Sequence, residues 1–232
     1  MIKAVIFDLD GTLLNRDESV KLFIHRQYER LNAYVGHIPK ETYITRFIEL
    51  EKRGYVWKDQ VYQQLVKECK ITGITWEELF QDYLTEFKNC CEPFVNLITM
   101  LDTLKEQNFL LGMITNGFGQ FQMDNIKALG IEAYFDVILI SEWEGIKKPD
   151  SQLFHRAIEK LNISPQESIF IGDHPLNDVK GAKDIGMISI WKKDNQFNDV
   201  EADYIVDDLM ELPVIIREIN HNCYIEKSSL SQ

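Results

Sequence analysis

The spacing of apolar residues changes twice along this chain of 232 residues. A short apolar run, residues 3–7, is rich in β-branched and aromatic side chains and predicts a buried strand. From about residue 18 to residue 87, apolar residues recur at helical spacing, as at Val20, Ile24 and Tyr28, and no segment has the pattern of a strand. This stretch predicts a small module of roughly four helices.

After residue 93, apolar strands alternate with amphipathic helices. The predicted strands are 109–115, 135–141, 168–172, 187–191 and, at the sheet edge, 204–206. Such alternation predicts right-handed βαβ units and a parallel sheet with helices on both faces, which is an α/β fold.

The helical module interrupts this alternation after the first strand, so we interpret it as an insertion. The predicted domains are a core of residues 1–16 and 89–219 and an inserted helical module of residues 17–88. Residues 220–232 are polar and without periodicity, and we expect them to form a flexible tail.

Charge and composition narrow the possible partners. The formal net charge is −12, so the protein repels nucleic-acid phosphates and anionic membrane surfaces, and we expect neither as a partner. The 4 cysteines form no metal-binding pair and no disulfide framework, as expected of free thiols in the cytoplasm. No apolar run approaches the roughly 20 residues of a membrane span. An anionic substrate would need a local positive charge or a cation.

Polar residues follow the predicted strands at the points where ligands bind in open α/β sheets. They are Asp8, Asp10 and Thr12 after the first strand, Thr115, Asn116 and Gly117 after the second, Lys148 after the third, and Asp173 and Asp178 after the fourth. Because the carboxyl ends of parallel strands share one edge of the sheet, we expect these side chains to lie close together.

This set of residue types indicates a site for a cation and a phosphate. Asp8 and Asp173 offer the hard oxygen ligands that Mg²⁺ prefers, and grouped carboxylates repel one another unless a divalent cation neutralises them. The Lys148 ammonium, the Thr115 hydroxyl and backbone N–H groups around Asn116 can hold phosphate oxygens.

The spacing of Asp8 and Asp10 predicts two roles on one substrate. Residues two apart in an extended segment point to the same side, so Asp8 can act as the nucleophile while Asp10 acts as general acid and base. Each motif also has an ordinary explanation, because Asp178 could cap a helix and residues 115–117 are typical of a turn. The combination in this order favours chemistry.

Two further sets of residues have ordinary interpretations. Gly117-Phe-Gly119 after a strand is half of a dinucleotide-binding pattern, but Gln122 stands where its third glycine belongs, so we reject that function. The basic residues of the helical module could reach a substrate, although a solvated helix face is the preferred interpretation for most of them. They are Arg46, Lys52, Arg53 and Lys58.

These motifs resemble the haloacid-dehalogenase-like hydrolase superfamily, in the branch with a helical cap inserted after the first motif. Residues 8–12 (Asp-Leu-Asp-Gly-Thr) resemble the first motif, 115–117 the second, 147–150 the third with Lys148 as its lysine, and 172–178 the fourth. The resemblance covers about residues 1–215.

The resemblance implies a Rossmann-like, doubly wound core with a helical cap, Asp8 as nucleophile, and Mg²⁺ held by Asp8, Asp10 and Asp173. In the family the residue at position 10 offers its carboxyl group and its backbone carbonyl to the cation. Members that cleave carbon–halogen bonds lack a carboxylate there, so Asp10 favours phosphate monoesters.

The expected function is a Mg²⁺-dependent phosphatase acting on a small phosphorylated metabolite, such as a sugar phosphate or a nucleoside monophosphate. A phosphomutase using the same intermediate is one alternative. A phosphate-responsive regulatory protein with little turnover is another, and Asp10 together with the inserted module argues against it. The sequence leaves the metabolite, the cap residues that select it, and the choice between monomer and homodimer open.

Overall fold

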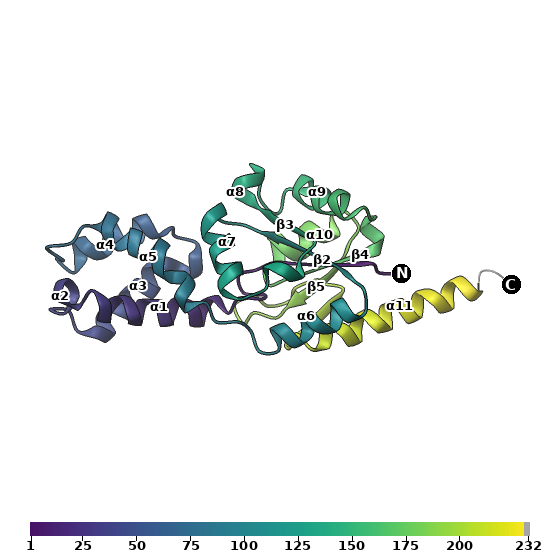
Figure 1. Cartoon of the computed structure of the whole chain (residues 1–232), viewed down its shortest axis with the longest axis horizontal. Coiled ribbons are helices and arrows are strands. Elements are labelled where there is room, and N and C mark those ends of the chain that lie inside the picture. The colour runs from purple at the N-terminus through teal and green to yellow at the C-terminus, as the bar shows by residue number, and fades with distance from the viewer. Residues whose placement is uncertain (230–232) are drawn as a thin grey trace. The chain divides into compact units, whose positions relative to one another are not determined.

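The computed structural model describes residues 1–229, and side-chain environments as far as residue 224. The chain forms two compact units: residues 1–14 together with the chain from residue 93 onward, and residues 15–92 (Figure 1). We call them the core unit and the inserted unit. Within the described residues, no helix is long and apolar enough to cross a membrane.

The core unit contains a sheet of six parallel strands in the order β3-β2-β1-β4-β5-β6. The first strand pairs with both β2 and β4, so the strand order changes direction beside β1. Ligands bind at such switch points in doubly wound sheets, and the predicted α/β fold class is confirmed. The strands are β1 Ala4–Phe7, β2 Leu110–Thr115, β3 Val137–Ile140, β4 Ser168–Gly172, β5 Ile188–Lys192 and β6 Tyr204–Val206.

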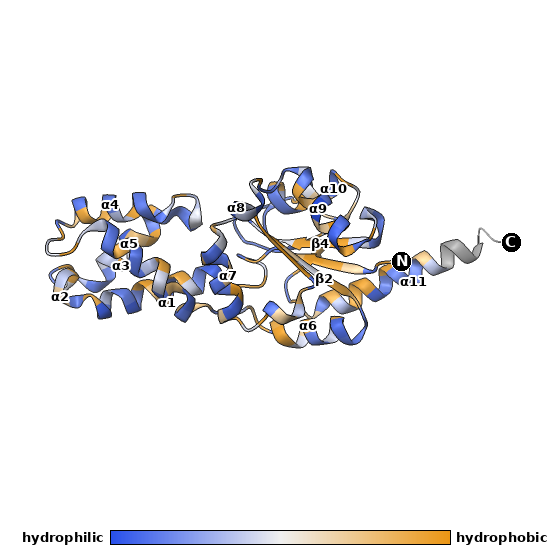
Figure 2. Ribbon diagram, turned by 45° about the horizontal axis from the view of Figure 1, so that its top comes forward, coloured by the Kyte–Doolittle hydropathy of each residue, from blue (hydrophilic) through white to orange (hydrophobic). Residues whose placement is uncertain are grey.

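Helices cover both faces of this sheet, with α9 and α10 on one face and α6 and α11 on the other (Figure 1). The central strands are mostly hydrophobic (Figure 2), and every residue of β1 and β4 is buried, as expected for strands covered by helices on both faces. The core-unit helices are α6 Leu97–Glu106, α7 Gly119–Ala128, α8 Ser141–Glu144, α9 Ser151–Leu161, α10 Gly181–Lys183 and α11 Glu211–Ser229. Short turns of helix are η3 Glu132–Tyr134, η4 Pro165–Glu167 and η5 Pro175–Lys180.

Helix α9 shows how the sequence produces this packing. Its residues Leu153, Phe154 and Ala157 lie on one helical face and pack in a buried cluster with Ile6 and Phe170 of the sheet. Burial of such side chains contributes roughly 1.5–3 kcal/mol each for the larger ones. The helix therefore fixes the loop before it, which carries one of the candidate site residues.

The end of the chain differs from the sequence-based expectation. Helix α11 continues to Ser229, so the tail predicted from residue 220 overlaps its C-terminal half. Residues 230–232 lie outside the described part of the chain.

The inserted unit consists of helices. They are α1 Arg16–Arg30, α2 Asn32–Val35, α3 Lys40–Glu51, η1 Lys52–Gly54, α4 Lys58–Glu68, α5 Trp76–Glu86 and η2 Phe87–Cys90. Their core is aromatic, and at its centre buried Gln27 accepts hydrogen bonds from the hydroxyl groups of Tyr43 and Tyr62, at 3.2 and 2.9 Å. Buried polar atoms paired in this way give the packing directional specificity.

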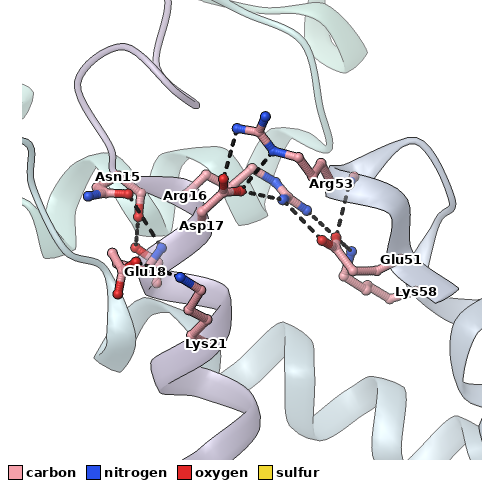
Figure 3. A network of polar contacts seen from close by, with 10 residues as sticks. Asn15, Arg16, Asp17, Glu18, Lys21, Glu51, Arg53 and Lys58 are labelled. Carbon is pink, nitrogen blue, oxygen red and sulfur yellow. Dashed lines mark hydrogen bonds and ion pairs between the residues drawn. The ribbon is translucent and has the colours of Figure 1, made fainter. Parts of the chain in front are cut away.

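A buried ion network lies in the same unit (Figure 3). The carboxylate of Glu51 accepts hydrogen bonds from Arg16, from Lys58 Nζ at 2.8 Å and from the backbone N–H of Gly54 at 2.9 Å. Lys58 is only 1% exposed, so the interpretation of a solvated face is wrong for this residue. Arg53 pairs with Asp17 at 2.8 Å in the same network.

Candidate active site

The nucleophile candidate and the lysine candidate meet at the carboxyl edge of the sheet. Asp8 directly follows β1, and its Oδ1 lies 2.6 Å from Lys148 Nζ. The same ammonium donates to Asp178 Oδ1 at 2.7 Å. All three side chains are buried, with Lys148 only 3% exposed. The structure thus brings together residues from the first, third and fourth predicted motifs.

Asp173 completes the acidic cluster. Oxygen atoms of Asp8, Asp173 and Asp178 lie within 4.8 Å of one another. Two glycines make this packing possible. A Cβ atom at Gly11, whose φ is +83°, would lie 2.2 Å from Asp173 Oδ2, and one at Gly172 would lie 2.4 Å from the Asp178 side chain. The glycines of the first and fourth motifs therefore provide the space for the carboxylates.

The cluster carries more negative than positive charge. Burial raises the pKa of Asp8, and the attraction of Lys148 offsets this only in part, because Asp178 repels the same charge. Burial, with repulsion from Asp8, also raises the pKa of Asp173 well above its usual range. Burial alone would lower the pKa of Lys148, but Asp178 and Asp8 outweigh it and keep the ammonium charged.

This chemistry fits a bound Mg²⁺ ion. Carboxylate oxygens are the ligands that Mg²⁺ prefers. A divalent cation would also offset the repulsion between the carboxylates, which adds to the effect of burial on the pKa values of Asp8 and Asp173. Of the three residues that the family resemblance assigns to the cation, Asp8, Asp10 and Asp173, this cluster contains Asp8 and Asp173. The third carboxylate, Asp178, is already hydrogen bonded to Lys148 and to the backbone N–H of His174, at 2.9 Å for the latter.

The carboxylate of Asp10 lies outside the cluster of three. Its Oδ2 accepts a hydrogen bond from Gln122 Nε2 at 2.6 Å, and the same nitrogen donates to Thr115 Oγ1 at 2.8 Å. Gln122 is a buried residue of α7, and the sequence analysis considered it only as a mismatch to a dinucleotide-binding pattern. A polar side chain on the buried face of the helix after a motif was the signal that could have identified it.

Asn116 uses its side chain to hold the lysine loop. Its Nδ2 donates to the Lys148 carbonyl at 3.1 Å, and its Oδ1 accepts from the Lys148 N–H at 2.9 Å. Because the side chain of Asn116 is used in these two bonds, its predicted contact with phosphate would be made by its backbone N–H. The N–H of Gly117 donates to Ser141 Oγ at 2.9 Å. Thr12 is buried, and its Oγ1 has no hydrogen-bond partner within the described part of the chain.

Comparisons with known proteins identify the family of this chain. The haloacid dehalogenase-like hydrolase family matches residues 5–192. Glyceraldehyde 3-phosphate phosphatase of Pyrococcus furiosus is 25% identical over 94% of this chain and 95% of that protein. Phosphoserine phosphatase of Thermus thermophilus is 33% identical over 82% and 88%. The crystal structure of a HAD phosphatase from Thermococcus onnurineus is similar with a TM-score of 0.66 and 29% identity, covering 93% and 98%. The chain belongs to the haloacid dehalogenase-like hydrolase family.

Proposed function

We propose that this protein is a cytoplasmic, Mg²⁺-dependent phosphomonoester hydrolase that acts on a small phosphorylated metabolite, a sugar phosphate or a nucleoside monophosphate. The observation that carries the proposal is the buried Asp8 carboxylate, held 2.6 Å from Lys148 Nζ with a second aspartate two residues later. The names of the relatives support hydrolysis of phosphate esters. The four cysteines are free thiols, which supports the cytoplasmic location.

Substrate binding needs positive charge in an acidic protein. Lys148 has three N–H groups, of which Asp8 and Asp178 accept one each, so the third can donate to a phosphate oxygen. The Thr115 hydroxyl and the backbone N–H of Asn116 would hold further phosphate oxygens. Mg²⁺ would be held by Asp8, Asp173 and the backbone carbonyl of Asp10, and when bound it reduces the repulsion between the phosphate and the carboxylates.

The reaction has two steps on Asp8. An Asp8 carboxylate oxygen attacks phosphorus, the bond between phosphorus and the ester oxygen breaks, and Asp10 gives its proton to the departing alkoxide. Asp10 then takes a proton from a water molecule, which attacks the phosphorus of the aspartyl-phosphate and releases phosphate and the Asp8 carboxylate. General acid–base help of this kind is typically worth roughly 10²–10⁴ in rate.

The test is phosphate release from a panel of sugar phosphates, nucleoside monophosphates and phosphoamino acids, with Mg²⁺ or with a chelator. We expect release by the wild type with Mg²⁺, a loss with chelator, and no release by Asp8→Asn. Asp102→Asn is the matched control, because Asp102 is an exposed residue of α6 that bonds to Tyr134 and not to the site. This control should keep full activity.

A folded, Mg²⁺-loaded wild type that releases phosphate from no monoester would contradict the proposal. Transfer of phosphate to a second sugar hydroxyl without release would instead identify a phosphomutase. An Asp8→Asn variant as active as the wild type would exclude Asp8 as the nucleophile.

A further inference from the structure

A single buried amide joins two residues of the proposed site that come from different strand ends. Gln122 is 2% exposed. Its Nε2 lies 2.6 Å from Asp10 Oδ2 and 2.8 Å from Thr115 Oγ1, and a longer contact of 3.4 Å reaches the carbonyl of Asn116. An amide nitrogen has two hydrogens, so the two short contacts use both of them.

The surroundings of Gln122 hold this amide in one orientation. Asn125, which is also buried, donates to Gln122 Oε1 at 3.4 Å. The reverse orientation would place Oε1 against the Asp10 carboxylate, where two acceptors would repel each other. Gly117 provides the space, because a Cβ atom there would lie 2.8 Å from Gln122 Cγ. The glycine of the second motif thus allows Gln122 to reach Asp10.

We propose that Gln122 is a positioning residue that orients Asp10 for proton transfer and Thr115 for phosphate binding. The proposal rests on the proposed function of the site. With Oδ2 of Asp10 accepting from Gln122, the proton that Asp10 exchanges with the leaving group is carried by Oδ1. With Oγ1 of Thr115 accepting from the same amide, the threonine O–H is free to donate to a phosphate oxygen.

The effect of removing this amide follows from the kind of bond that is lost. Asp10 gains negative charge as it gives its proton to the alkoxide, and a hydrogen bond to a charged group corresponds to roughly a 10- to 150-fold change in an equilibrium or rate. We therefore expect Gln122→Met, which keeps the length of the side chain without its donors, to lower kcat/KM for an alkyl phosphate roughly 10- to 150-fold.

The choice of leaving group separates positioning of Asp10 from a general loss of structure. An alkoxide needs a proton as it leaves, whereas 4-nitrophenolate leaves without one. The kcat/KM value reports the first irreversible step, which is here the phosphorylation of Asp8. Gln122→Met should therefore lose several-fold more activity toward an alkyl phosphate than toward 4-nitrophenyl phosphate. A fall in kcat/KM that is the same for both substrates measures the contribution of Gln122 to phosphate binding through Thr115.

Two further variants complete the experiment. Gln122→Glu has nearly the same size but cannot donate to Asp10 when ionised, so its loss toward the alkyl phosphate should be at least as large. Gln120→Met is the matched control, because Gln120 lies on the same helix but is exposed and bonds to Asp124. It should change neither substrate's kcat/KM. Equal losses toward both substrates in both Gln122 variants, or no loss in either, would overturn the proposal.

A readout without turnover separates this proposal from the proposed function. Crystal structures of the wild type and Gln122→Met should differ in the side-chain torsion angles of Asp10. The same Asp10 conformation in both crystals would overturn the positioning role, even if the wild type releases phosphate rapidly. Failure of the wild type to hydrolyse any monoester would contradict the proposed function alone, and the crystals would still decide whether Gln122 positions Asp10.

Discussion

Substituting glutamine for Glu51 removes the negative charge that Arg16 and Lys58 share inside the inserted unit (Figure 3). Glu51 is 2% exposed, and burial alone would raise its pKa. The charges and hydrogen bonds of Arg16 and Lys58 outweigh burial and hold the pKa of Glu51 at about 2, below the usual 4.5. Because the folded-state pKa is lower than the unfolded one, the ionised carboxylate stabilises the fold above pH 4.5, and this contribution is lost as the pH falls toward 2.

The interval between these two pKa values sets the magnitude of the effect. It corresponds to on the order of 3 kcal/mol of unfolding free energy at pH 7 and to about 1 kcal/mol at pH 3. Glutamine does not titrate, so the difference in stability between wild type and Glu51→Gln should narrow by roughly 2 kcal/mol between these pH values. Loss of the Glu51 negative charge beside the buried Lys58 ammonium acts in the same direction at pH 7.

Urea denaturation followed by far-UV circular dichroism at pH 7, 5 and 3 measures this difference. Hydrogen exchange of the backbone amides of residues 40–68 shows whether the loss of stability lies in the inserted unit. Glu49→Gln is the matched control, because Glu49 lies on the same helix but is exposed and pairs with Arg46 at the surface. We expect it to change stability by less than about 0.5 kcal/mol. A difference between wild type and Glu51→Gln that stays constant from pH 7 to pH 3 would refute the electrostatic explanation.

Two predictions concern the core unit. Lys148→Met removes the buried ammonium paired with Asp8. We expect the rate of phosphate release, measured by turnover, to fall by more than roughly 100-fold. The free energy of unfolding, measured by urea denaturation in the presence of chelator, should fall by about 3–5 kcal/mol. Gly11→Ala would place a Cβ atom 2.2 Å from Asp173 Oδ2, so Mg²⁺ affinity measured by calorimetry should fall. Gly130→Ala is the control, because Gly130 also has positive φ but nothing lies within 4 Å of the added Cβ atom. An unchanged Mg²⁺ affinity in both variants would contradict the idea that Gly11 provides space for Asp173.

The clustering of Asp8, Lys148, Asp173 and Asp178 could be predicted from sequence because it follows from the sheet. Each strand end carried a polar residue, and in a parallel sheet these ends share one edge. Asp8 and Lys148 are separated by 140 residues in sequence, and yet their side chains are hydrogen bonded. Strand boundaries were less accurate: the strand predicted at 135–141 is observed at Val137–Ile140, because Ser141 begins helix α8 and Phe135 follows the helical turn η3, changes that an apolar pattern does not register.

The ion network of the inserted unit could not be predicted in the same way. A lysine such as Lys58 on an amphipathic helix has the same local pattern whether it faces water or a buried carboxylate. The carboxylate that it bonds to belongs to Glu51 of α3, and Arg16, which bonds to the same carboxylate, lies on α1. Only the packing of these helices determines that Lys58 is buried. Burial of a charged side chain depends on finding a partner, which is a property of the folded unit rather than of its helix.

Gln122 illustrates the same limit at the site itself. Asp10, in the loop after β1, and Gln122, in the helix after β2, are 112 residues apart in sequence. They are in contact because β1 and β2 are neighbours in the sheet. The carboxyl ends of parallel strands share one edge of the sheet, so the helix that follows β2 begins at the same edge as the loop that follows β1, and its first turn can face that loop. Buried polar residues in that first turn are therefore candidates for contact with strand-end residues. The positions of polar residues at strand ends predict the groups that we propose to react, and the first turn of the following helix adds the group that we propose to orient them.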